Sequence, residues 1–145
     1  MSRILAVDYG RKRVGLAVTD KAQIIANGLD TVSSNYCISY LENYFAKEDV
    51  ELIVIGYPKK MNNQASEAVV YVDRFISDFK KKFPGKEYFL IDERFTSKMA
   101  FQAMIDGGLK KKQRQDKAMI DKVSATIILQ SYLEMRDNNL NSEGK

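Results

Sequence analysis

The chain of 145 residues contains no histidine, and its one cysteine is Cys37. Without histidine, the Ser-His-Asp and Cys-His nucleophile systems, imidazole zinc sites and histidine acid-base chemistry are all excluded. A single cysteine cannot form an intrachain disulfide, which agrees with a reducing compartment. Any hydrolytic chemistry must therefore rest on carboxylates, lysines or bound metal ions.

Long hydrophobic runs are also missing. The longest apolar stretches, "LIVI" and "TIIL", fall far below the roughly 20 residues of a membrane span. The amino-terminal residues enter a strand-like run too early for a secretory signal, so we expect a cytoplasmic protein without a membrane partner. The formal charge of +4 only weakly favours a polyanionic partner.

Short runs of Val, Ile and Leu alternate with segments whose apolar residues follow helical spacing. Strands are predicted at 3–9, 13–19, 23–32, 51–58 and 84–95, and helices at 34–50 (with Ser34 and Asn35 as caps), 66–83, 96–108 and 120–137. The opening strands form an antiparallel meander, whereas strands alternating with helices favour parallel crossovers. We expect one α/β domain over 1–137, a mixed five-stranded sheet flanked by helices, and a flexible tail over 138–145.

Three acidic positions fall where such a sheet places binding sites. Asp8 ends the first strand, Asp92 and Glu93 end the last one, and Asp121 starts the last helix. Ligands bind outside the carboxyl ends of strands in open α/β sheets. Side chains alternate along a strand, so only one of Asp92 and Glu93 can join Asp8.

Converging carboxylates without histidine suit hard cations such as Mg²⁺ or Mn²⁺. Two ions about 4 Å apart would activate a water and stabilise the leaving oxygen in phosphodiester cleavage. From the residues alone, each of these acids could instead have a purely structural role. Asp8 could close the hairpin turn, Glu93 could pair with Arg94 or Arg13, and Asp121 could favour the helix dipole.

Four ordered motifs carry a resemblance to a known family: "ILAVDYGRKRVGLAVTD", "LIVIGYPKKMN", "LIDERFTS" and "DKVSATIILQSYL". They resemble the YqgF/RuvX family of pre-16S rRNA nucleases, whose members are also described as Holliday junction resolvases. The similarity spans roughly residues 3–135. One departure is Asn62-Asn63, where family members often carry Asp-Gly.

The resemblance implies a ribonuclease H-like fold and a nuclease that matures the 5′ end of 16S rRNA with Mg²⁺ or Mn²⁺. The family's acidic residues fall on Asp8, Glu93 and Asp121, the same set that converges in the predicted sheet. The implied partner is precursor 16S rRNA, with branched DNA as an alternative, and the chain would act as a monomer or weak homodimer.

Basic segments flank the expected acidic site and could bind the phosphates of a nucleic acid with little dependence on its base sequence. Near Asp8 lie Arg11, Lys12 and Arg13, of which the first two are the main candidates. Arg94 follows Glu93, and a loop before the last helix carries Lys110, Lys111, Lys112 and Arg114. A solvated charged loop is the alternative for the last cluster. Tyr9 and Tyr57, at strand ends, are weaker candidates for nucleotide contact.

Three rival functions remain from the sequence. An actin-like ATPase or sugar kinase also begins with a D-x-G hairpin, but it needs a second similar half that this chain lacks. A binding module that kept the fold without catalysis would tolerate loss of the acids. A Holliday junction resolvase shares the chemistry, but it normally requires a dimer with two sites facing one junction.

Overall fold

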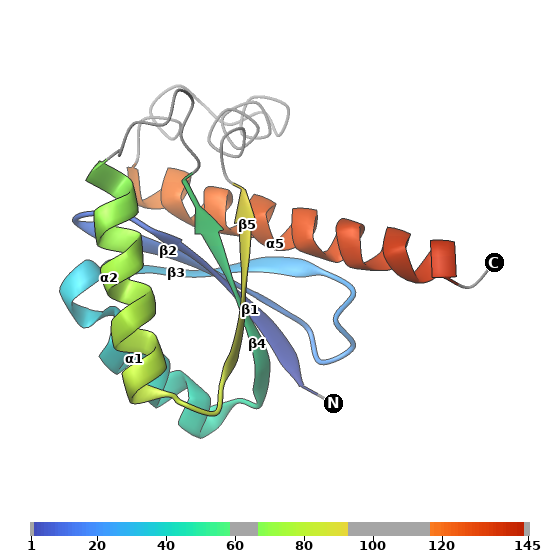
Figure 1. Cartoon of the computed structure of the whole chain (residues 1–145), viewed down its shortest axis with the longest axis horizontal. Helices are drawn as coiled ribbons and strands as arrows, with labels where there is room; N and C mark the ends of the chain where they lie inside the picture. Colours follow the sequence, from blue (N-terminus) through green and yellow to red (C-terminus); the bar gives the residue numbers. More distant parts are fainter. Residues whose placement is uncertain (1, 59–66, 93–116, 144–145) are drawn as a thin grey trace.

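The computed structural model describes residues 2–58, 67–92 and 117–143 (Figure 1). The strands are β1 (Arg3–Tyr9), β2 (Arg13–Thr19), β3 (Ala26–Ser33), β4 (Val50–Tyr57) and β5 (Glu87–Asp92), and the helices are η1 (Ser34–Tyr36), α1 (Cys37–Lys47), α2 (Glu67–Lys82) and α5 (Lys117–Glu143). The predicted helix over 96–108 lies outside the described residues.

The five strands form one mixed sheet in the order β3-β2-β1-β4-β5. β1 pairs antiparallel with β2 and parallel with β4, β2 pairs antiparallel with β3, and β4 pairs parallel with β5. This arrangement confirms the predicted meander followed by two parallel crossover strands. β1 is the central strand, so its carboxyl end is flanked on both sides.

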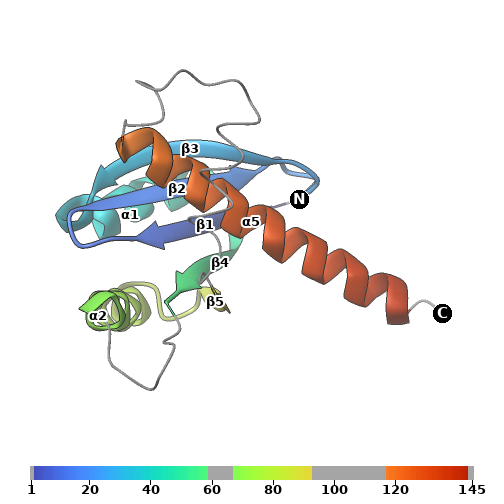
Figure 2. The ribbon, with the colours of Figure 1, turned by 90° about the horizontal axis from the view of Figure 1, so that it is seen from above.

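Each face of the sheet has its own hydrophobic core. On one face, Leu5 and Val7 pack with Phe75 and Phe79 of α2 and with Leu41 of α1. The opposite face is covered by α5, whose buried residues Ala125, Ile128 and Leu129 pack against Ile4, Ala6, Ala17 and Val54. Figure 2 shows α5 lying across the strands. The alternation of side chains along β1 therefore sends successive residues to different helical layers.

The boundaries of two helices, α1 and α5, differ from the sequence-based expectation. Ser34 and Asn35 do not cap α1, because residues Ser34–Tyr36 form a 3₁₀ turn and α1 starts at Cys37 without a side-chain cap. The Ser34 hydroxyl donates instead to the Arg11 carbonyl, 2.7 Å away. α5 starts earlier than expected and continues to Glu143, so the boundary near 137 is wrong as a helix end.

Among the described residues, no helix is long and apolar enough to cross a membrane.

Candidate functional site

Asp8 lies at the carboxyl end of β1, on the face of the sheet that α5 covers. Residues two apart along a strand share a face, so Asp8 follows Ile4 and Ala6, which both pack in the α5 core. Across the antiparallel pair, the partner of Asp8 is Gly15 on β2. The carboxylate is partly exposed, which leaves it accessible at this end of the sheet.

Gly15 brings α5 against the sheet beside Asp8. A Cβ atom at Gly15 would lie 2.0 Å from the carbonyl oxygen of Asp121 and 3.2 Å from its Cα. Only a residue without a side chain allows this approach of helix to strand. The Asp121 backbone thus lies directly over Gly15, the residue that pairs with Asp8, so the start of α5 lies beside the carboxyl end of β1 (Figure 1).

The carboxylate of Asp121 is held by Arg13, a partner that the sequence-based interpretation did not assign to it. Arg13 Nε donates to Asp121 Oδ2 over 3.0 Å, and the two side chains are 39% and 24% exposed. Arg13 is two residues before Gly15 and so shares its face of β2. That alternation was the available signal, but the sequence suggested only a role for Arg13 in phosphate binding or a pair with Glu93, not a pair with Asp121. Asp121 is also the fifth residue of α5, not part of its first turn.

The third predicted acid, Glu93, lies outside the described residues, as do Arg94, Lys110, Lys111, Lys112 and Arg114. The end of β5 is nevertheless informative. Ile91 packs in the α5 core, and Phe89 makes an edge-to-face contact with Tyr132 of α5, with ring centroids 5.3 Å apart. Asp92 shares a face of β5 with Tyr88, because residues an even number of positions apart along a strand point the same way. Tyr88 packs in the core on the α2 side, so Asp92 lies on the face away from Asp8.

Arg11 and Lys12 of the predicted basic cluster are exposed in the β1–β2 turn, and Arg11 does not converge on Asp8. The guanidinium of Arg11 lies over the ring of Tyr71 on α2, 5.9 Å from its centroid, which places it on the other face of the sheet. Tyr9 and Tyr57 also belong to the α2 side: Tyr9 stacks on Phe75 and the Tyr57 hydroxyl donates to Asp73. These contacts place both side chains on the α2 side of the sheet, and nucleotide contact by them stays a prediction.

The arrangement offers two carboxylates and one guanidinium at a partly exposed sheet end. The donor set is all oxygen, since the chain has no histidine. Such donors fit a hard divalent cation, and the adjacent guanidinium fits a phosphate. In the parts of the chain that the structure describes, no group of three potential ligands is assembled.

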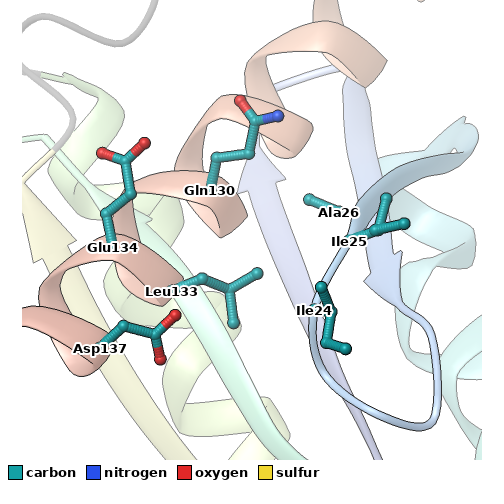
Figure 3. A pocket seen from close by; sticks show the side chains of 7 residues that line it. All are labelled: Ile24, Ile25, Ala26, Gln130, Leu133, Glu134 and Asp137. Carbon is teal, nitrogen blue, oxygen red and sulfur yellow. The ribbon is translucent and has the colours of Figure 1, made fainter. Parts of the chain in front are cut away.

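A separate hollow of about 390 Å³ lies between α5 and the loop that joins β2 to β3 (Figure 3). The side chains of Ile24, Ile25 and Leu133 line it together with Glu134 and Asp137. This loop is at the opposite end of β2 from the turn next to Asp8. The hollow is therefore not part of the acidic site.

A family model described as "RuvX: Holliday junction resolvase" matches residues 2–135. The chain belongs to the RuvX family. This confirms the family indicated by the four sequence motifs.

Relatives of high similarity share the name "Putative pre-16S rRNA nuclease". One from Flavobacterium psychrophilum is 56% identical over 133 residues, covering 92% of this chain and 97% of the relative. Another from Phocaeicola vulgatus is 57% identical over 136 residues, covering 94% and 98%. This RuvX chain thus matches such relatives over nearly their whole length.

Solved structures resemble the chain at low identity. RuvC of T. thermophilus in complex with a Holliday junction substrate has a TM-score of 0.55 at 16% identity, covering 93% of this chain and 96% of that one. A second RuvC structure from Thermus thermophilus gives 0.53 at the same identity, covering 92% and 96%. The likeness shows the fold, and the ribonuclease H-like prediction for this RuvX chain is confirmed.

Proposed function

We propose that the protein is a metal-dependent nuclease that hydrolyses phosphodiester bonds in the 5′-end maturation of precursor 16S rRNA in the cytoplasm. The observation that carries the proposal is the placement of Asp121 over Gly15, the partner of Asp8. Two acids 113 positions apart in sequence meet at one end of a ribonuclease H-like sheet. The relatives' shared name supports the substrate.

Asp8 and Asp121 would hold Mg²⁺ or Mn²⁺, with Glu93 as the third ligand. The alternation along β5 favours Glu93 over Asp92, because Phe89 and Ile91 both face α5. The ions would activate the attacking water and stabilise the leaving oxygen. The protein's own part is to fix the carboxylates on rigid elements, a central strand and a long helix.

Arg13 supplies the positive charge of the site. Its Nε orients the Asp121 carboxylate, while the fork geometry of a guanidinium leaves further N–H groups for a phosphate oxygen. With 39% of the side chain exposed, the guanidinium is accessible to a substrate. We expect Arg13 to position the scissile phosphate next to the acids.

The test compares Asp8→Asn and Asp121→Asn with wild type on labelled precursor rRNA and on junction DNA, with Mg²⁺ or Mn²⁺. Each variant should lose cleavage but keep or slightly raise RNA affinity, since a negative charge near phosphate is removed. Asp49→Asn is a matched control, because Asp49 is an exposed acid before β4 at the other end of the sheet. Near wild-type cleavage by either site variant would contradict the assigned ligand.

Resolution of Holliday junctions is the second candidate function. It is favoured by the description of the family model and requires a dimer that presents two sites to one junction. Cleavage of junction DNA in preference to precursor rRNA would replace the proposed substrate. RNA binding by wild type without any cleavage would favour a binding module.

A further inference from the structure

A groove lies on the α2 side of the sheet, just behind the acidic site. It encloses about 480 Å³, and its lining includes Arg11, Tyr71 and Arg74. Tyr9 forms part of its floor, stacked on Phe75 with ring centroids 4.7 Å apart. Tyr9 directly follows Asp8, and successive strand residues point to opposite faces. The groove and the acids are therefore separated only by the edge of the sheet at the β1–β2 turn.

Two exposed guanidinium groups give the groove its positive charge. Arg11 lies over the Tyr71 ring at 5.9 Å, and Arg74 comes from the next turn of α2. Within the described part of the chain, neither arginine forms an ion pair. Asp78 also lines the groove and offsets one of the two charges. The net charge of the lining is thus +1, which favours an anion at the arginines.

The remaining lining provides flat and polar surfaces. Tyr71 offers an aromatic ring from α2, and Ser34 and Asn35 offer polar groups from the opposite wall. A guanidinium next to an aromatic ring matches a nucleotide, because the phosphate takes the charge and the base stacks on the ring.

We propose that the groove formed by Arg11, Tyr71 and Arg74 binds a nucleotide of the single-stranded RNA that flanks the cleavage site. The inference rests on the proposed function for its substrate. An RNA strand held at Asp8 can pass around the exposed β1–β2 turn and enter the groove on the other face. Its contacts are to phosphate and to the base face, so they hold the strand without reading its sequence.

The test measures binding of a labelled single-stranded RNA by fluorescence anisotropy at several salt concentrations. All proteins carry Asp8→Asn, so that binding is followed without cleavage. Arg11→Gln with Arg74→Gln should make the slope of log K against log salt shallower by about 1.4, or 0.7 for each lost contact. Tyr71→Leu should weaken binding at least about fivefold while leaving the slope unchanged.

The matched control removes two positive charges from the other end of the molecule. Lys21 follows β2 and Lys47 ends α1, and both are exposed. Lys21→Gln with Lys47→Gln lowers the net charge equally and should leave both affinity and slope near those of the parent. Circular dichroism of every variant verifies folding. Equal effects of the groove pair and the control pair would overturn the proposal.

Cleavage by the protein with Asp8 intact separates the two proposals. If wild type does not cleave RNA but the groove variants still lose binding, the nuclease assignment fails and the groove stands as an RNA site. If wild type cleaves and the groove variants match the control, the groove assignment fails alone. A length series adds a direct readout, since extending the RNA past the cleavage site should raise affinity only when the groove is intact.

Discussion

Replacement of Gly15 by alanine tests the contact that brings the two described acids together. The added Cβ would lie 2.0 Å from the carbonyl oxygen and 2.4 Å from the carbonyl carbon of Asp121. Both are backbone atoms, so no side-chain rotation relieves the clash. The first turns of α5 must therefore move away from β2, and Asp121 must move with them.

The size of the effect follows from these distances. Ordinary contact begins near 3.4 Å, so the helix must shift by about 1.4 Å at this point. Overpacking of this kind costs about 1–3 kcal/mol, which corresponds to a loss of about 3–10 °C in Tm for a chain of this size. Misplacing a catalytic group by about 1 Å can reduce the rate roughly 100-fold. We expect Gly15→Ala to lower cleavage more than stability alone explains.

The assay pairs thermal unfolding with cleavage of labelled RNA at saturating metal, at a temperature where the variant is fully folded. Two glycines give a graded series. A Cβ at Gly85 meets nothing within 4 Å, and one at Gly28 meets the flexible Lys122 side chain at 2.7 Å. Gly85→Ala should be neutral or slightly stabilising, and Gly28→Ala should cost little. A Gly15→Ala protein with wild-type Tm and cleavage would refute the close approach of α5.

Three further predictions address single groups. Arg13→Gln should strengthen metal binding a few-fold, because a positive charge beside Asp121 is removed, and it should raise KM for RNA. Calorimetry measures the metal affinity and steady-state kinetics measures KM, and weaker metal binding would contradict the charge argument. Burial raises the pKa of Cys37 to about 12, so the thiol of the native protein should resist alkylation at pH 8. The same thiol should react quickly in denaturant, and rapid labelling of the folded protein would show that it is accessible. A variant with glutamine at Lys110, Lys111, Lys112 and Arg114 should show a shallower slope of log K for RNA against log salt, by about 0.7 for each lost contact. An unchanged slope would show that these residues carry only solvated charge.

Much of the fold follows from short-range patterns. The runs around Leu5 and Leu16 gave the first hairpin with its observed bounds, because alternating burial and a Gly-containing turn leave little choice of pairing. Helix ends were less predictable. Ser34 has a side chain that commonly caps helices, yet its hydroxyl donates a hydrogen bond to the carbonyl oxygen of Arg11. This contact depends on how the β1–β2 turn packs against the segment that starts α1. Such a contact depends on tertiary geometry, which local propensity does not contain.

The sequence pointed to two of the proposed acids but not to the residues that support them. Asp8 and Asp121 were identified from a strand end and a helix start, and in the structure Gly15 pairs with Asp8 and contacts the Asp121 backbone. Arg13 was missed as the partner of Asp121, because 108 residues separate them and only the packing of α5 on β2 makes them neighbours. Arg11 was expected to lie beside the acids because it is only three residues after Asp8. The turn sends it across the sheet edge to Tyr71 instead.

The ion pair between Arg13 and Asp121 explains how an acidic site can stand in a folded protein before a cation binds. Neighbouring carboxylates repel each other, and a guanidinium beside one of them reduces this repulsion. Because both side chains are partly exposed, the pair itself contributes at most about 1 kcal/mol to stability. The packing of Ala125, Ile128 and Leu129, not the ion pair, therefore holds α5 on the sheet. We therefore expect the charge of Asp121 to matter more for the chemistry of the proposed site than for the stability of the fold.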